Sequence, residues 1–424
     1  MNNHQFIYDF KEDPYANNCD LELQYVAGSF FDSSPERSGL AHLTEHLFLD
    51  REENKRLKDN GVYYNAYTNS ELMGLTFSGP YTTKYEYGIS SAFTTIERIL
   101  EGKERLINEE DLTREKNIIL NELHQITNDA NKFIFNEYNK IIYKKGNPYR
   151  QISDLGTAVI GSTESINSIA VADVNGFINK NISNNSCIVK LYYEGSRSNF
   201  EALLDRIQSL IAAVSKSSLV SNMYPYDKLD LLEQDTDRKI IKIDSVSEKN
   251  VRVLNLYTYV GLREESPEAN ILRYIWKNAL NTSIYYLTRK LGVGYRSKTG
   301  VTQLSLKQLH NIEYSLNDSS QADDLIVKTN EEIDIYISQN MDSFIENALR
   351  MYNIECDIHP INPSSELNSR VKQFRKYGKE LHTLQQLRDE TLSLDKEYVK
   401  GLFTQLFKNK LRTIKVEIGS NPIT

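Results

Sequence analysis

A strand–turn–helix pattern near the start of the chain recurs in its second half, and this recurrence most limits the possible folds. A Ser-Pro-Glu tripeptide at 34–36 follows a predicted strand at 20–32 and precedes a predicted helix at 38–59. The same tripeptide at 266–268, 232 residues later, follows two predicted strands and precedes a helix that ends near Leu280. A shared tripeptide is weak evidence by itself, but the shared element order predicts a tandem duplication.

The rest of the chain indicates two domains of one fold class. A Ser-rich stretch with little periodicity at 215–237 predicts a boundary, which gives domains over 1–225 and 226–424. We expect each domain to be α+β, with a mostly antiparallel sheet and helices packed on one of its faces. Further strands are expected at 72–78, 186–193, 238–246, 251–260 and 412–418, and further helices over 84–102, 109–144 and within 366–409.

The composition argues against several classes of protein. The 424 residues carry 50 Lys and Arg against 58 Asp and Glu, and this net charge of −8 does not suit a dedicated nucleic-acid binder. The sequence has no run of 18 apolar residues, so no membrane span is expected. The first residues lack the pattern of a secretory signal. Three widely spaced cysteines argue against a disulfide framework, so we expect a cytoplasmic protein.

The motif His-Leu-Thr-Glu-His at 42–46 carries the clearest chemical signal. On a helix, His42 and His46 are four residues apart and project from one face about 40° apart. Two imidazoles on adjacent turns can hold one Zn²⁺ ion, and Glu45 lies on the same side as His42. Glu45 is therefore the predicted general base, which takes a proton from water at the metal. A chance match to this pattern is expected only roughly 0.01 times in such a chain.

A catalytic zinc site needs a third protein ligand and keeps one position open for water. Glu115 and Glu122 are seven residues apart, or two helical turns, so they share one face of the helix predicted over 109–144. Glu122 is the candidate third ligand, and Glu115 is the candidate for orienting a histidine through a hydrogen bond. Without the histidine motif, two such glutamates would indicate only a solvated helix face.

These motifs resemble those of the zinc peptidase family that includes pitrilysin, insulin-degrading enzyme and mitochondrial processing peptidase. The matching segments are SGLAHLTEH at 38–46, NAYTNSE at 65–71 and EKNIILNEL at 115–123. The resemblance implies zinc as the cofactor, with His42, His46 and Glu122 as its ligands. It also implies Glu45 as the general base and Glu115 as a supporting acid.

The resemblance also assigns a peptide-binding segment in the first half. It implies that Asn65 and Ala66 lie near the bound peptide, where an edge strand pairs with the substrate. The match extends over about residues 20–190 and is weaker beyond them.

The segment Leu287–Tyr295 resembles a family element in which an Arg and a Tyr, seven residues apart, hold the substrate carbonyl and the tetrahedral intermediate. Tyr295 matches this pattern and is a candidate catalytic residue. Thr288 occupies the arginine position, and Arg289 lies one place later, which rotates its side chain by about 100° on a helix. Arg289 is thus a substrate-binding candidate, although its position departs from the family pattern. An equal alternative is that the segment is simply a helix that ends at a glycine.

The resemblance implies a dimer, because family chains of this length correspond to one half of a two-half chamber. We expect a heterodimer with a homologous subunit that lacks zinc and supplies the Arg/Tyr pair. A homodimer is the second choice. At the 232-residue offset, the zinc-site positions become Tyr274, Lys277 and Asn278, which cannot bind zinc. One Zn²⁺ ion is therefore expected per chain.

The sequence thus predicts a half-length zinc metalloendopeptidase subunit of bacterial type. It is expected to hydrolyse peptides or unstructured precursor segments in a dimer-enclosed chamber, and leader peptides of modified peptide products are one specific substrate class. The alternative is a non-catalytic structural core subunit that keeps the peptidase fold. A third hypothesis is an adaptor that binds peptides without cutting them.

Overall fold

The computed structural model describes residues 4–32, 34–48, 51–103, 107–127, 137–154, 159–214, 231–232, 239–244, 250–292, 297–304, 307–316 and 322–419. The chain divides into two compact units. Unit 1 takes Met1–Asn136, Pro148–Pro225 and Asn362–Glu380, and unit 2 takes Glu137–Asn147, Tyr226–Ile361 and Leu381–Thr424. The units differ from the two contiguous domains expected, because each contains a segment from the other half of the sequence.

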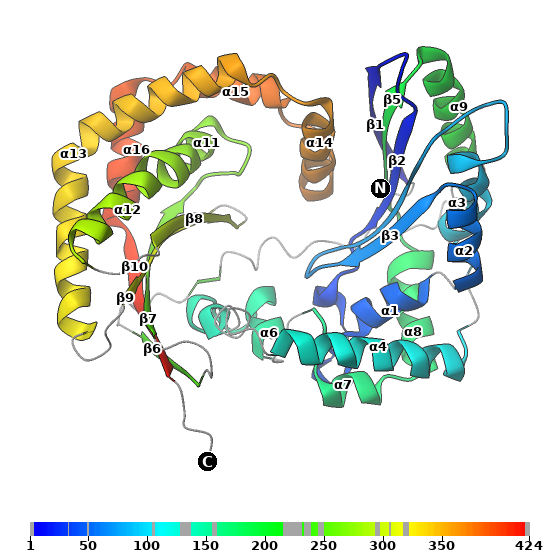
Figure 1. Ribbon diagram of the computed structural model, residues 1–424, viewed down its shortest axis with the longest axis horizontal. Coiled ribbons are helices and arrows are strands. Elements are labelled where there is room, and N and C mark those ends of the chain that lie inside the picture. The colour runs from blue at the N-terminus through cyan, green and yellow to red at the C-terminus, as the bar shows by residue number, and fades with distance from the viewer. Residues whose placement is uncertain are drawn as a thin grey trace. The chain divides into compact units, whose positions relative to one another are not determined.

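Unit 1 is built on a five-stranded sheet with the strand order β1-β5-β2-β4-β3 (Figure 1). Its strands are β1 (Gln5–Glu12), β2 (Asn18–Tyr25), β3 (Tyr63–Thr68), β4 (Met73–Gly79) and β5 (Ile188–Gly195). β1 and β5 pair in parallel, and the other neighbours are antiparallel. Side chains alternate between the two faces, so Leu21, Leu23 and Tyr25 all join the main core on one face. β3 is an edge strand of this sheet.

Helices contribute buried side chains to the main core on that face of the sheet. They are α1 (Leu40–Phe48), α2 (Arg51–Asp59), α3 (Phe93–Leu100), α4 (Glu109–Thr127), α7 (Thr163–Ser168), α8 (Val171–Ile178) and α9 (Arg197–Val214). A further helix, α6 (Pro148–Asp154), packs against the 3-10 helix Ser29–Phe31. The main core takes Leu43 and Leu47 from α1, Ile119 from α4 and Leu203 from α9. The core thus fixes α1 and α4 relative to the sheet.

One helix of unit 1 lies on the opposite face of the sheet. α14 (Pro363–Tyr377) packs against β1 and β5. Its Leu367 and Val371 are buried with Ile7 and Ile188 in a separate apolar cluster. One covered face was expected, but β1 and β5 carry apolar side chains on both faces, so both are covered there.

Unit 2 repeats the same sheet plan with the order β6-β10-β7-β9-β8. Its elements are β6 (Lys239–Asp244), β7 (Asn250–Val260), α11 (Pro267–Tyr274), a π-helix (Ile275–Leu280), α12 (Asn281–Lys290), β8 (Ser297–Gln303), β9 (Lys307–Leu316), α13 (Ala322–Ile358), α15 (Leu384–Leu392), α16 (Lys396–Lys408) and β10 (Lys410–Gly419). β10 pairs with β6 in parallel and with β7 antiparallel. Each strand of unit 2 thus takes the sheet position of the strand five earlier, and the prediction of two related α+β domains is confirmed.

The two Ser-Pro-Glu tripeptides adopt different structures. Ser266 caps α11, because its side chain accepts a hydrogen bond from the Ala269 N–H and Pro267 fits the first turn. In the first half, Pro35–Arg37 forms a short 3-10 helix instead. The two tripeptides therefore lie at corresponding places in the two halves of the chain, but they do not form the same turn.

Several predicted element bounds were wrong. The strand expected at 20–32 ends at Tyr25, and Ser29–Phe31 is a 3-10 helix held by hydrogen bonds from the Ser29 and Phe30 N–H groups to Asn69 and Ser70. The helix expected over 84–102 begins only at Phe93. The single helix expected over 38–59 is two helices, α1 and α2, and the region 366–409 holds three helices. The helix expected over 109–144 ends at Thr127 as α4, and residues 128–136 lie outside the described part.

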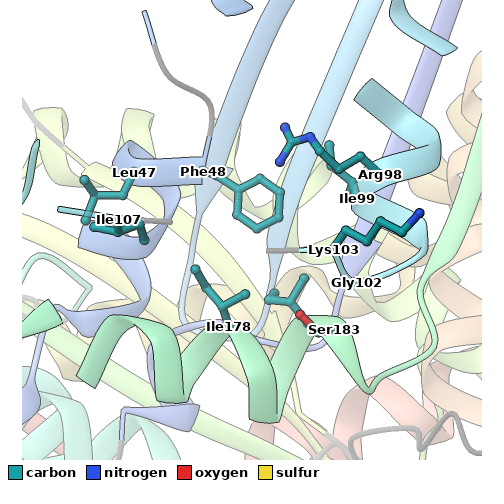
Figure 2. A pocket seen from close by; sticks show the side chains of 10 residues that line it. Leu47, Phe48, Arg98, Ile99, Gly102, Lys103, Ile107, Ile178 and Ser183 are labelled. Carbon is teal, nitrogen blue, oxygen red and sulfur yellow. The ribbon is translucent and has the colours of Figure 1, made fainter. Parts of the chain in front are cut away.

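A small apolar cavity lies behind the end of α1. Its volume is about 20 Å³, and its walls include Leu47, Phe48, Ile107 and Ile178 (Figure 2). A space of this size holds about one water molecule, so it cannot be a ligand site. No helix among the described residues is long and apolar enough to cross a membrane.

Candidate metal centre

The histidine motif lies on α1, and the start of this helix is anchored by a distant carboxylate. The two oxygens of Asp32 accept hydrogen bonds from the N–H groups of Gly39 and Ala41, each at 2.9 Å. Gly39 has a φ of +90°, and a Cβ there would lie 2.4 Å from the carbonyl oxygen of Ile160. Only glycine fits this position, which brings the chain into α1 close to the loop before α7.

The apolar side chains of α1 turn its polar side outward. Leu40, Leu43 and Leu47 are buried in the core, whereas His42, Glu45 and His46 are only partly buried. The helical period then places His42 and His46 together, with ring centroids 4.8 Å apart and planes at 88°. α1 packs against α4, which brings Glu122 to the two imidazoles.

Glu122 completes a compact set of three donors. Its Oε2 lies 3.9 Å from Nε2 of His42, and its Oε1 lies 3.8 Å from Nε2 of His46. One donor atom from each of the three residues falls within 4.8 Å of the others, and this is the one such group found among the described residues.

The donor set fits a zinc ion. Bonds of about 2.0–2.1 Å in a tetrahedral site place ligand atoms roughly 3.3 Å apart, about half an ångström closer than the distances seen. Burial, helped by His46, lowers the pKa of His42 to about 4, so its imidazole is in the neutral form that ligates. Two imidazoles and one carboxylate leave one tetrahedral position for water.

Glu45 lies beside the donors without being one of the three. Its Oε2 is 4.0 Å from Nε2 of His42, and its side chain is 12% exposed. Burial raises the pKa of Glu45, and the neighbouring charge of Glu122 adds to this effect, while His46 opposes it. A carboxylate so placed can accept a proton from a molecule bound between the histidines.

Glu115 orients the second histidine from behind. Its Oε2 lies 3.4 Å from Nδ1 of His46, which leaves Nε2 of that ring directed at the donor set. The other oxygen of Glu115 accepts a hydrogen bond from Nε of Arg114 at 3.0 Å, and Arg114 also pairs with Asp111 at 2.8 Å. This chain of contacts fixes the orientation of the imidazole.

The predicted peptide-binding residues lie on β3, next to α1. Asn65 is exposed and pairs in register with Thr76 of β4. Ala66 is half-buried and packs on the main core. Both therefore lie on an edge strand beside the histidine helix.

The second-half candidates are only partly described. Thr288 is buried, and its hydroxyl donates to the Ile284 carbonyl at 2.9 Å. Arg289 is exposed, and its guanidinium donates to the Tyr285 hydroxyl at 2.9 Å. Tyr295 lies outside the described residues.

Sequence reasoning missed Asp32, Arg114 and Asp111. Helix-capping rules search next to the first helical residue, but Asp32 reaches Gly39 from seven positions earlier. Arg114 and Asp111 are ordinary residues of a charged helix start, and only the packing of α4 on α1 gives them a role.

The comparisons with known proteins agree with this geometry. The sequence pattern of the insulinase family, Peptidase family M16, matches residues 10–154. The chain is 23% identical over 174 residues to the Homo sapiens mitochondrial-processing peptidase subunit beta. This alignment covers 39% of this chain and 32% of that protein. It is 19% identical over 218 residues to an uncharacterized zinc protease of Rickettsia felis. This alignment covers 50% of this chain and 49% of that protein. The matches thus span 32% and 49% of the length of these two curated relatives.

A solved structure matches the whole fold. The inactive domain of a peptidase M16 from Pseudomonas fluorescens superposes with a TM-score of 0.70 at 16% identity, over 98% of this chain and 96% of that one. At this identity the likeness establishes the fold alone.

Proposed function

From the match of residues 10–154 to the insulinase family, peptidase family M16, we propose that this chain is the zinc-binding subunit of an endopeptidase of that family. The observation that carries the proposal is the complete set of His42, His46 and Glu122 with Glu45 beside it. The name of the Rickettsia felis relative supports zinc as the metal.

Each residue of the set has a distinct task in peptide hydrolysis. Zinc, when bound, supplies a Lewis acid that polarises the scissile carbonyl and makes water a stronger acid. His42, His46 and Glu122 hold it. Glu45 accepts the proton of the attacking water and returns it to the leaving amine, and its raised pKa suits a group that does both. Glu115 keeps His46 in the ligating tautomer.

The proposed substrate is an extended peptide or an unstructured precursor segment in the cytoplasm. The support is the edge position of β3 beside α1, because an edge strand offers backbone groups to an extended chain. Asn65 and Ala66 lie on that strand. Leader peptides of modified peptide products are the specific class that we propose within this group.

The proposed assembly is a heterodimer with a homologous subunit that supplies an arginine and a tyrosine. The support is that Thr288 fills the arginine position with a buried hydroxyl, while Arg289 is engaged with Tyr285. A relative whose name includes "subunit beta" is consistent with an assembly of unlike chains. A homodimer that uses Arg289 and Tyr295 is the second choice.

A structural core subunit is the competing function. The resemblance of the fold to a domain described as inactive favours it. The intact donor set and the adjacent Glu45 oppose it, because a purely structural chain has no need of either.

Metal content and cleavage of a mixed peptide library test the proposal together. We expect one zinc per chain, and for Glu45→Gln an unchanged zinc content with cleavage reduced by about 10²–10⁴-fold. Glu122→Gln should lose zinc, and Glu52→Gln, an exposed change on α2, should alter neither quantity.

The wild-type results also separate the assemblies. Cleavage by the chain alone would favour the homodimer. One bound zinc without cleavage would favour the heterodimer. A chain that binds no zinc and cleaves nothing would overturn the peptidase and leave the structural subunit.

A further inference from the structure

A second cleft of unit 1 has no part in the metal centre. It has a volume of about 820 Å³ and opens between the end of α2, the loop after β4 and α9. None of its lining residues belongs to α1 or α4. The volume is within the range of about 300–1,000 Å³ that is typical of small-molecule sites. Figure 1 shows α2, α3 and α9 on one side of this unit.

Three cations line the cleft, one from each of its walls. They are Arg56 of α2, Lys84 of the loop and Arg206 of α9, against Glu86 as the one carboxylate in the described lining. Within the part of the chain that the structure describes, none of the three has a carboxylate within 4 Å. In a chain with a net charge of −8, a cleft with three unpaired cations is a local excess of positive charge.

Neutral groups hold Arg56 in place. Its guanidinium donates to the Ser91 carbonyl at 3.0 Å and to the Thr95 hydroxyl at 2.9 Å. These acceptors orient the guanidinium without forming an ion pair with it. The Thr95 hydroxyl in turn donates to Glu53 at 2.7 Å, and that carboxylate pairs with Arg98 at 2.7 Å. The Thr82 hydroxyl accepts a hydrogen bond from the Lys84 N–H at 3.2 Å, so its own proton is available to a ligand.

Aromatic faces hold the other two cations. The guanidinium carbon of Arg206 lies 5.6 Å from the ring centroid of Phe93, and Nζ of Lys84 lies 5.1 Å from that of Tyr85. Cation–π contacts of this kind also leave the charge available to an anion. Tyr85 is 52% exposed and lines the cleft, which gives the organic part of a ligand a flat apolar face.

The arrangement of the cations favours a phosphoryl group over a carboxylate. A carboxylate has two coplanar oxygens and is satisfied by a single guanidinium. A phosphate monoester carries close to two negative charges and three terminal oxygens, so it can meet cations from three separate elements. We propose that this cleft binds a phosphate monoester, with Arg56, Lys84 and Arg206 around the phosphoryl oxygens and Tyr85 against the organic group.

Calorimetric titration of the zinc-loaded chain tests the proposal with two probes, inorganic phosphate and phenyl phosphate. We expect saturable binding of both to one site. The double variant Lys84→Gln/Arg206→Gln should weaken it at least about tenfold, because two charge-assisted contacts are lost. Both side chains are exposed, so the fold should persist, and thermal unfolding checks this. Arg197→Gln is the matched control, since Arg197 also lies on α9 over a phenylalanine ring but outside the cleft.

The outcomes separate the sources of the phosphoryl group and can overturn the site. Tighter binding of phenyl phosphate than of phosphate identifies an organic monoester, and equal binding identifies free phosphate. Phosphate held at the metal centre would survive the double variant, and such unchanged binding overturns the proposal. Absence of saturable binding of both probes overturns it as well.

Discussion

Asp32 shows how one buried carboxylate prepares the helix that bears the histidines. It holds the N–H groups of Gly39 and Ala41, the residue immediately before His42. Burial raises the pKa of Asp32 to about 7, although the two backbone hydrogen bonds oppose that rise. The anchor of α1 is thus a group that titrates near neutrality.

The titration of Asp32 predicts a pH-dependent stability that Asp32→Asn should remove. Because the folded pKa lies above the ordinary value of 3.8, the folded protein keeps a proton that the unfolded chain has lost. This group therefore lowers the free energy of unfolding as the pH rises from about 4 to about 7. Urea unfolding of metal-free protein at several pH values measures this slope.

The free energy of unfolding of Asp32→Asn should change less with pH over that range than that of the wild type. Asp59→Asn, an exposed change at the end of α2, should leave the wild-type slope in place. Parallel curves for wild type and Asp32→Asn would show that Asp32 does not titrate as described.

At the scale of elements, a buried polar network joins the edge strand β3 to the middle of the sheet. The Tyr67 hydroxyl donates to Oε1 of Glu22 at 2.6 Å, and its ring covers Gly74, where a Cβ would lie 2.3 Å from a ring carbon. Lys190 of β5 lies 2.5 Å from the other oxygen of Glu22 and also donates to Asn368 of α14 at 3.0 Å. The strand proposed to receive the peptide is therefore connected to β2, β5 and α14.

The network makes Glu22 depend on Lys190. Burial by itself raises the pKa of Glu22, but Lys190 and the hydrogen bonds from Tyr67 and Gln24 outweigh burial and lower it. Lys190→Met leaves a buried carboxylate without its cation. We expect the free energy of unfolding to fall by about 3 kcal/mol, the lower end for broken buried pairs, because Lys190 is 17% exposed.

Chemical denaturation of three variants checks this expectation. Lys190→Met with Glu22→Gln should recover part of the loss, since the uncompensated charge is gone. Lys11→Met breaks an exposed pair with Glu194 on the same sheet and should cost much less than Lys190→Met, because water screens an exposed pair. Equal losses for Lys190→Met and Lys11→Met would contradict the buried-pair account.

At the scale of the whole molecule, α14 comes from the second half of the sequence but packs in unit 1. Leu367 and Val371 are at most 2% exposed against β1 and β5. The Arg370 guanidinium donates to the Tyr8 carbonyl at 2.9 Å, which adds a polar contact to the apolar one. The polypeptide thus passes from unit 2 into unit 1 and back, so neither unit is a continuous piece of chain.

Val371→Asp should loosen unit 1 selectively. It places a charge in an apolar contact with no cation among the residues of that cluster, a change that typically costs several kcal/mol. Hydrogen exchange should accelerate in β1 and β5 and stay unchanged in β7 and β9. Ile358→Asp, at an exposed position at the end of α13, should change neither region. Uniform acceleration in both sheets would contradict the assignment of α14 to unit 1.

The sequence alone determined those features that depend on local backbone geometry. The four-residue spacing of His42 and His46 and the seven-residue spacing of Glu115 and Glu122 are positions on single helices, where the period of 3.6 residues fixes the shared face. The repeated element order predicted two related α+β domains, and the common strand order of the two sheets confirms them. Zinc binding and the base role of Glu45 stay predictions until metal and activity are measured.

Only the tertiary structure decided which separate elements meet. The packing of α4 on α1 brings Glu122 to the histidines and Glu115 behind His46, and the route of the chain around Gly39 brings Asp32 to the helix start. The docking of α14 and the convergence of three cations on one cleft likewise join segments that are remote in sequence. Such meetings depend on how side chains from distant segments fill a common core, and no local period encodes that.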